Sequence, residues 1–172
     1  LDVFFPRTCP VCGQVLADNE YVCADCLAHF DRTEQALNRD NETEKYFAHI
    51  PDFGWGGCWL HYQKGASLQT LIHTAKFGIG NPPLLEQLGR EAAHEWQDTG
   101  FFDYIDVIVP VPLHKKRLRE RGFNQSEYIA KGLHNVLGIP IDTEHITRDR
   151  ATKQQSRSTY VERQSGVAGA FS

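Results

Sequence analysis

The sequence of 172 residues contains no methionine and no long apolar run. Because methionine is absent, we expect that Leu1 follows at least an initiator residue in the natural protein. No apolar stretch approaches the roughly 18 residues that a transmembrane helix requires, and the N-terminal segment lacks the pattern of a secretory signal peptide. We therefore expect a cytoplasmic protein with no membrane span.

An excess of positive charge is also missing. The chain has 18 Lys and Arg against 22 Asp and Glu, a formal net charge of −4. It therefore lacks the broad basic field of a general nucleic-acid binder. Its cations are instead concentrated in two segments, residues 115–121 and 148–163. Such a segment indicates either a local anion site or a solvated basic surface that touches nucleic acid or a protein partner.

Cysteine is present in a spacing that favours metal. Cys9, Cys12, Cys23 and Cys26 follow the pattern C-x2-C-x10-C-x2-C. Without a secretion signal, such a pattern favours metal binding over disulfides. Two C-x-x-C turns together supply four thiolates, a closed tetrahedral set that suits a structural Zn²⁺. A redox dithiol is the alternative, but no βαβ pattern surrounds either pair.

The middle of the chain predicts helices and a short strand. Residues 31–50 are polar and predict a helix plus a linker. Residues 58–62 are strand-like, and Cys58 within them is expected to be a buried thiol. Apolar periodicity then predicts one amphipathic helix from Ser67 and a second after Asn81, with prolines in its first turn.

The segment from Ile105 to Gln125 carries the strongest functional pattern. Residues 105–109 are apolar and β-branched, which predicts a buried strand of a parallel sheet. A cationic loop follows, then Gly122 as a flexible joint, and then a helix that starts at Asn124 and ends before Gly138. A strand, a basic loop and a helix N-terminus in succession are typical of an anion site. The cations of the loop are Lys115, Lys116, Arg117, Arg119 and Arg121.

The C-terminal part is less regular. Residues 139–146 offer another short strand, and the segment beyond them is polar, basic and rich in glutamine. We expect an exposed loop there, then a short helix near residues 160–165, then the approach to one more strand. The alternative is disorder near a chain end.

Several motifs, taken in order, resemble those of the competence protein F (ComF) family, within the phosphoribosyltransferase-like superfamily. The motifs are CPVCG…CADC, HYQKG, AKFG, VPVPLHKKRLRERGFNQ and TKQQSRSTYVER…GAF. The resemblance implies an α/β fold of the type I phosphoribosyltransferase class: a mainly parallel sheet flanked by helices, with a small N-terminal zinc module built on four cysteines. It divides the chain into a zinc module (1–30), a helical or polar linker (31–50) and a phosphoribosyltransferase-like domain (51–172).

The same resemblance implies a ligand, 5-phosphoribosyl 1-pyrophosphate (PRPP), held with Mg²⁺. The basic loop, residues 113–125, would then bind the pyrophosphate, while no catalytic residue is assigned. Relatives in that family continue into an acidic pair and a Thr/Gly-rich turn that binds the 5-phosphate. That turn does not occur in the sequence, so we expect the domain to be incomplete at its C-terminus, either because the sequence stops before the turn or because this copy has lost it. The implied ligand-binding residues are Lys76, Lys115, Lys116, Arg117, Arg119, Arg121, Asn124, Gln125, Arg148, Gln155 and Arg163.

Two functions follow from these motifs. The first is a phosphoribosyltransferase that converts PRPP and an acceptor into a ribosylated product and pyrophosphate, in DNA uptake, natural competence or nucleotide metabolism. The second is a non-catalytic adaptor in DNA uptake that contacts a helicase or single-stranded DNA. The scarcity of aromatic residues beside the cations disfavours a single-strand binding platform.

Overall fold

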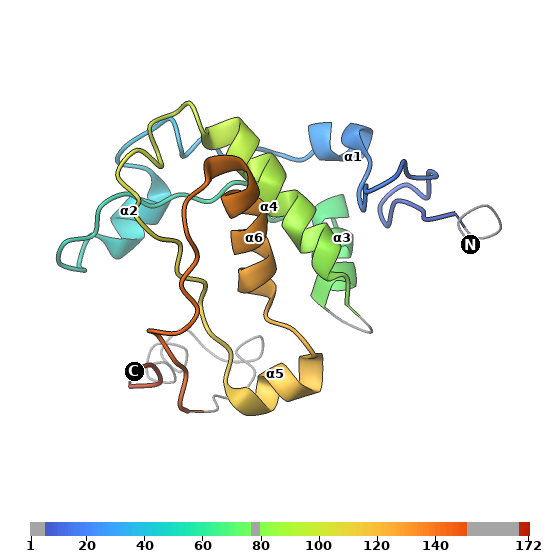
Figure 1. Cartoon of the computed structure of the whole chain (residues 1–172). Helices are drawn as coiled ribbons and strands as arrows, with labels where there is room; N and C mark the ends of the chain where they lie inside the picture. The colour runs from blue at the N-terminus through green and yellow to red at the C-terminus, as the bar shows by residue number, and fades with distance from the viewer. Residues whose placement is uncertain (1–5, 77–79, 151–168) are drawn as a thin grey trace.

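The computed structural model describes residues 6–76, 80–150 and 169–172. Helices and irregular segments dominate these ranges (Figure 1). No helix among the described residues is long and apolar enough to cross a membrane. The helices are α1 (Ala24–Ala28), α2 (Glu42–Phe47), α3 (Ser67–Lys76), α4 (Pro82–Trp96), α5 (Lys115–Arg121) and α6 (Gln125–Leu137).

Helices α4 and α6 lie side by side at the centre of the molecule (Figure 1). Two glycines allow their backbones to touch. A Cβ atom on Gly89 would collide with the carbonyl of Ile129, and one on Gly132 would collide with the backbone of Glu86 and Arg90. Glycine costs a helix interior about 1 kcal/mol relative to alanine. Both glycines are therefore explained by close helix packing, not by local helix preference.

Three of the predicted helices are confirmed, and two of them have the predicted asparagine at their N-cap. Helix α3 begins at Ser67. The side-chain oxygens of Asn81 and Asn124 accept hydrogen bonds from the first turns of α4 and α6, each at 3.2 Å. Gly138 ends α6 with φ at 71°, the left-handed conformation that favours glycine. Short polar caps thus determine where α4 and α6 begin, and a left-handed glycine ends α6.

The cysteine-rich segment shares its apolar core with α3 and α4. Val22, Leu71 and Leu84 have no exposed surface, and they come from these three parts of the chain. Leu27 and Phe30 belong to the same buried cluster. Burying these side chains together fixes the N-terminal segment against the helices.

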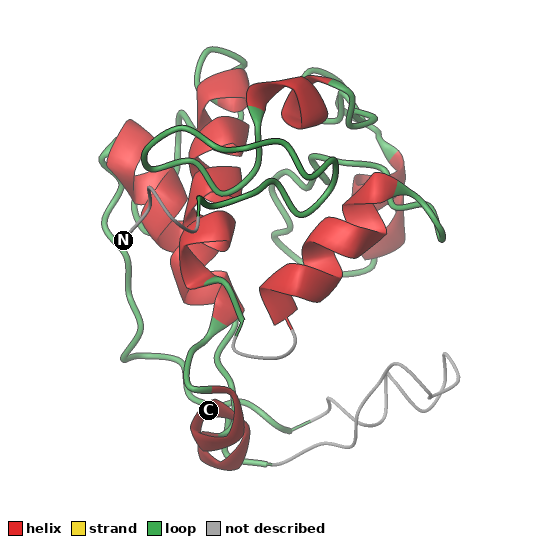
Figure 2. Cartoon of the chain, turned by 90° about the vertical axis from the view of Figure 1, so that its right-hand side faces the viewer, coloured by secondary structure: helices red, strands yellow, loops and turns green. Residues whose placement is uncertain are grey.

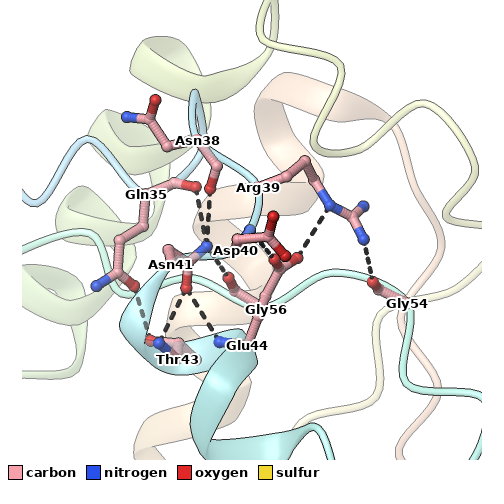
Figure 3. Close-up of polar contacts among 9 residues, drawn as sticks. All are labelled: Gln35, Asn38, Arg39, Asp40, Asn41, Thr43, Glu44, Gly54 and Gly56. Atoms are coloured by element: carbon pink, nitrogen blue, oxygen red, sulfur yellow. Dashed lines mark hydrogen bonds and ion pairs between the residues drawn. The ribbon is translucent and has the colours of Figure 1, made fainter.

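The linker predicted over residues 31–50 contains α2 and is held by one asparagine (Figure 3). The amide of Asn41 donates to three backbone carbonyls, including that of Gly56 at 2.8 Å. Its oxygen accepts from the N–H groups of Thr43 and Glu44, which caps α2. Arg39 pairs with Glu44 at 3.1 Å. Asn41 therefore joins the start of α2 to the loop around Gly56.

The predicted sheet is represented among the described residues by isolated bridges. Ile108 forms one isolated parallel bridge with Ile141, but the predicted mainly parallel sheet is not confirmed, because the described residues contain no named strand. The prediction that residues 105–109 are buried is wrong for Ile105, Val107 and Val109, which are 44%, 43% and 40% exposed. The physical reason is that this segment pairs with one other segment, through the bridge between Ile108 and Ile141. That single pairing leaves the side chains of Ile105, Val107 and Val109 partly exposed.

Cys58 also differs from its prediction. The residue is exposed, not buried. Its N–H donates to the side-chain oxygen of Gln35 at 2.8 Å, and its sulfur lies 3.5 Å from the hydroxyl of Thr43. Polar neighbours, and not an apolar strand, surround it. The strand expected at residues 58–62 is reduced to one antiparallel bridge between Arg32 and Leu60.

We predict that Gly132→Ala destabilises the protein. The added methyl group meets the backbone of α4, and overpacking of this kind costs about 1–3 kcal/mol in the free energy of unfolding. Urea denaturation followed by circular dichroism measures the change. Gly54→Ala is the matched control, because nothing lies within 4 Å of its added Cβ. Equal midpoints for Gly132→Ala and the wild type would contradict the close contact between α4 and α6.

Candidate metal centre and anion-binding site

The four cysteines of the predicted metal site converge. The sulfur atoms of Cys9, Cys12, Cys23 and Cys26 all lie within 4.8 Å of one another. Those of Cys12 and Cys23 are 3.7 Å apart. A tetrahedral group of four thiolates with zinc–sulfur bonds of about 2.3 Å separates its sulfurs by about 3.8 Å. The residues therefore fit a structural Zn²⁺, which supplies cross-linking and leaves no coordination position for a substrate.

Backbone hydrogen bonds shape the turn that carries the first cysteine pair. The N–H of Cys9 donates to the carbonyl of Gln14, and the N–H of Gly13 donates to the carbonyl of Cys9, both at 2.8 Å. Gly13 has φ at 77°, which a side chain would disfavour. Cys23 lies directly before α1 and occupies its N-cap position. A tight turn and a helix start thus direct the two thiol pairs toward one point.

The thiols differ in how readily they ionise. Burial opposes ionisation of Cys9, yet backbone N–H groups of Cys23, Cys12 and Val11 outweigh it and lower the pKa of Cys9 to about 6. The N–H of Cys26 favours the Cys23 thiolate, but burial and the neighbouring sulfurs outweigh it and raise the pKa of Cys23. Burial, followed by the other sulfurs, raises the pKa of Cys26 well above the usual range. Without metal, the cluster thus favours ionisation of Cys9 and holds protons on Cys23 and Cys26.

Gln87 of α4 connects this cysteine cluster to the helices. Its side chain is buried, and its oxygen accepts from the N–H groups of Tyr21 at 2.7 Å and Val22 at 3.1 Å. Its nitrogen donates to the carbonyl of Val22 at 3.0 Å. Sequence reasoning missed this residue. The available signal was a glutamine placed three residues after Leu84, on the apolar side of its helix.

A second connection lies near the end of α4. Glu95 accepts hydrogen bonds from Arg32 and from the indole N–H of Trp59, the latter at 2.6 Å. Partial burial raises the pKa of Glu95, but these bonds and the charge of Arg32 outweigh it and lower the pKa overall. Arg32 also donates to the carbonyls of Leu27 and Phe30 at 2.7 and 2.8 Å. One guanidinium thus joins the end of the cysteine module to α4.

The basic segment forms a helix where a loop is predicted. Residues 115–121 make up α5, which has no buried residue and lies apart from the other helices (Figures 1 and 2). The ring nitrogen of His114 accepts from the N–H of Lys116 at 3.2 Å and caps the helix. Gly122 ends it with φ at 85°. The loop prediction is wrong because Lys and Arg are good helix formers and both ends are capped.

The junction between α5 and α6 gathers several of the predicted ligand-binding residues. Arg121 donates to the side-chain oxygen of Gln125. The nitrogen of that same amide is buried and has no hydrogen-bond partner among the described residues. Burial and the nearby charge of Arg117 lower the pKa of Arg121, while Arg117 itself pairs with Glu120 at 3.1 Å. The junction therefore combines crowded positive charge with an unused donor.

Asn124 holds this junction in place. It is 3% exposed, and its amide donates to the carbonyl of Val111 at 3.1 Å and to Glu127 at 3.0 Å. Its oxygen caps the first turn of α6 at Ser126. The prediction that Asn124 holds the loop and caps the following helix is supported by these contacts. The first residue of α6, Gln125, is also the residue to which Arg121 donates its hydrogen bond.

Three other predicted residues lie on α3 and α5. Lys76 ends α3, and four residues later Gly80 packs so tightly on Phe123 that a Cβ would lie 2.5 Å from the ring. Gly80, which lies shortly before α4, is therefore packed against the residue that precedes Asn124. Lys116 and Arg119 are exposed on α5.

Arg148 lies on the segment that approaches the start of α5. It forms an antiparallel bridge with Phe171. Hydrogen bonds from Ser172 and Thr147, and then the charges of Lys115 and His114, lower the pKa of the neighbouring Asp149. The residues predicted at 155 and 163, Gln155 and Arg163, lie outside the described residues, as does the short helix predicted near 160–165.

We predict that zinc binding releases at least two protons near pH 7. Metal ligation requires thiolates, whereas the raised pKa values of Cys23 and Cys26 keep both protonated in the metal-free protein. Protons thus compete with the metal, and zinc affinity should rise as pH increases from about 6 to about 8. Calorimetry of the chelator-treated full chain, in buffers of different ionisation enthalpy, counts the protons. Release of one proton or none would contradict this account.

We also predict that Gln87→Leu loosens the cysteine module. The change leaves two N–H groups and one carbonyl of Tyr21 and Val22 without their partner, and each buried unsatisfied group costs about 1–3 kcal/mol. Faster zinc loss to a colorimetric chelator is the expected readout. Gln97→Leu, the same substitution at an exposed position of the same region, is the matched control. Unchanged release from Gln87→Leu would show that the core alone holds the module.

Comparison with known proteins agrees with the cysteine geometry. The model of the double zinc ribbon domain matches residues 1–37. No solved structure gives a significant match to the chain.

Longer matches come from proteins named DNA utilization protein YhgH. The protein of Escherichia coli K12 is 29% identical over 167 residues, covering 87% of this chain and 70% of the relative. That of Escherichia coli O157:H7 is 31% identical over 164 residues, with the same coverage. That of Salmonella typhi is 41% identical over 107 residues, covering 60% of this chain and 47% of the relative. With its four cysteines placed as in a zinc ribbon, the chain therefore belongs to the family of the DNA utilization protein YhgH.

Proposed function

We propose that this chain is a ComF-type, phosphoribosyltransferase-like protein that binds PRPP at the α5–α6 junction and acts in DNA utilisation. The observation that carries the proposal is the side-chain amide of Gln125. Its oxygen is occupied by Arg121, and its buried nitrogen has no partner among the described residues. A buried donor without a partner is costly, and an anionic oxygen placed beside Arg121 would satisfy it.

The surrounding charges suit a pyrophosphate group. Helix α5 carries five cations in seven residues, and the 13-residue helix α6 begins beside Arg121 and adds the positive end of its dipole. When the C1–O bond of PRPP breaks, negative charge develops on the leaving pyrophosphate. Fixed cations and helix N–H groups stabilise that charge.

Magnesium would enter together with the ligand. The described residues contain one group able to hold a metal ion, the four cysteines, and it lies in the zinc ribbon. Pyrophosphate oxygens would therefore be the main ligands of Mg²⁺, which prefers oxygen and keeps several waters. In this proposal the protein's own residues bind and orient the phosphates.

The proposal also interprets the rest of the chain. Residues 1–30 form the zinc module, residues 31–50 the linker, and residues 51–172 the phosphoribosyltransferase-like domain. The parallel bridge between Ile108 and Ile141 would belong to the mainly parallel sheet of that domain. The sheet would place the α5–α6 junction just beyond the end of one strand, the usual position of a phosphate site.

A second candidate is a non-catalytic adaptor that contacts single-stranded DNA or a helicase in DNA uptake. Helix α5 favours it, because its cations stand on an exposed helix away from the others (Figure 2). The name of the relatives also concerns DNA. Against it, Phe123 packs on Gly80 and on the ring of Tyr128, with centroids 5.8 Å apart. Phe123 is therefore engaged in packing and does not offer a stacking platform for bases.

We predict that Arg121→Glu weakens binding of PRPP·Mg²⁺ by about 10- to 100-fold, the range expected for a lost charge-assisted hydrogen bond. Calorimetric titration of the zinc-loaded chain measures the affinity. Lys131→Glu is the control: it puts a negative charge in place of a positive one at an exposed position of α6, outside the predicted ligand-binding residues. A compact pyrophosphate site at the junction requires the Lys131 variant to bind within about threefold of the wild type.

Two variants of α5 distinguish the adaptor. If DNA phosphates are the target, Arg119→Glu and Arg121→Glu should weaken binding of a single-stranded oligonucleotide similarly, with a steep loss between about 50 and 200 mM salt. Absence of PRPP binding together with this DNA pattern would replace the first candidate by the second.

A further inference from the structure

A cleft opens between the zinc ribbon and the start of α3. Its volume is about 280 Å³, slightly below the roughly 300–1,000 Å³ of typical small-molecule sites. That size suits one or two side chains of a peptide better than a cofactor. The lining residues are Val11, Asp25, Cys26, His29, Phe30 and Ser67.

The walls of the cleft are held by contacts outside it. Phe30 is 8% exposed and belongs to the main apolar core. Its carbonyl, like that of Leu27, is fixed by Arg32, which pairs with Glu95 of α4. On the other wall, α3 is anchored through Leu68, which is also in the core. The cleft is therefore largely formed before any partner binds, which lowers the entropy cost of binding.

The N-terminal segment that supplies most of the cleft lining carries more acidic than basic residues. Among residues 6–31 the acidic side chains outnumber the single cation, Arg7, and a zinc ion with four thiolates adds a net charge of about −2. Negative charge repels nucleic-acid phosphates and free carboxylates, and it attracts Lys and Arg. The acidic residues are Asp18, Glu20, Asp25 and Asp31.

Asp25 is the acidic residue at the cleft itself. It is exposed, and its carboxylate makes no hydrogen bond or ion pair with another residue of the described ranges. His29 donates its Nδ1–H to the backbone carbonyl of Asp25 at 2.6 Å, not to the carboxylate. The carboxylate thus remains available to a cation beside an apolar floor of Val11 and Phe30.

We propose that this cleft docks a segment of a protein partner that carries an apolar anchor residue next to a Lys or Arg. The anchor side chain enters the cleft over Val11 and Phe30, and the adjacent cation pairs with Asp25. Burial of the apolar anchor supplies most of the binding energy, while the acidic surface favours a positively charged partner. This assigns the zinc ribbon a docking role that is independent of the α5–α6 junction.

The test is a selection of random dodecapeptides displayed on phage against the zinc-loaded full chain. Synthetic, fluorescein-labelled versions of the enriched peptides are then titrated by fluorescence polarisation. We expect enriched sequences with Leu, Ile, Met or an aromatic residue within two positions of Lys or Arg. Asp25→Lys should weaken their binding about tenfold or more through charge reversal at a rim position.

Two further variants separate the effect of the Asp25 charge from that of the general acidity of the zinc ribbon. Asp25→Asn removes the charge while preserving shape, and should weaken binding less than Asp25→Lys. Asp18→Lys makes the same reversal on the same module at a fully exposed side chain that is not in the cleft, and should leave affinity within about twofold. Zinc content of each variant confirms folding of the ribbon.

Three outcomes would overturn the proposal. The first is enrichment of acidic peptides, which would point to an anion site at the start of α3. The second is binding that falls equally in Asp18→Lys and Asp25→Lys, which would indicate attraction without a cleft. The third is absence of any enriched peptide whose binding depends on Asp25.

Discussion

The backbone contact between α4 and α6 is the constraint on which the rest of the structure depends. Gly89 and Gly132 let the two helices approach until backbone meets backbone. Because α6 is fixed in this way, its N-terminus and the cap Asn124 are fixed as well. Helix α4 also reaches the zinc ribbon through Gln87 and Glu95. One helix therefore positions both the metal centre and the candidate anion site.

The two ends of this framework carry opposite charge. The zinc ribbon is acidic, whereas α5 is basic, although the net charge of the chain is only −4. A site for phosphates and a site for a basic peptide can thus coexist in one small protein, because exposed charges are screened beyond about 8–10 Å at physiological salt. This separation explains why the total charge alone says little about partners.

The sequence predicted features that depend on neighbouring residues along the chain. The spacing of the cysteines predicted the metal site, and periodicity with caps predicted α3, α4 and α6. Gln87 was missed because its partners, Tyr21 and Val22, lie about 65 residues away. No local pattern indicates that a glutamine on an apolar helix face will cap a distant turn.

The errors have two origins, a local one for α5 and a tertiary one for residues 105–109 and Cys58. We predicted a loop for residues 115–121 because we gave the analogy with known folds more weight than the helix preference of Lys and Arg. Residues 105–109 looked buried because β-branched runs usually are, whereas burial depends on which segments cover them. Cys58 was assigned to a core on its type alone, yet Gln35 and Thr43 give it polar neighbours. Only tertiary contacts could decide the last two cases.

The α5–α6 junction is, in this account, the place where a phosphate ligand binds. Hydrogen–deuterium exchange of the zinc-loaded chain, with and without saturating PRPP·Mg²⁺, tests this most directly by locating the bound ligand. The account predicts slower exchange of the backbone amides of residues 122–127, at the start of α6, with the zinc ribbon unchanged. Protection confined to the ribbon, or no change anywhere, would contradict it.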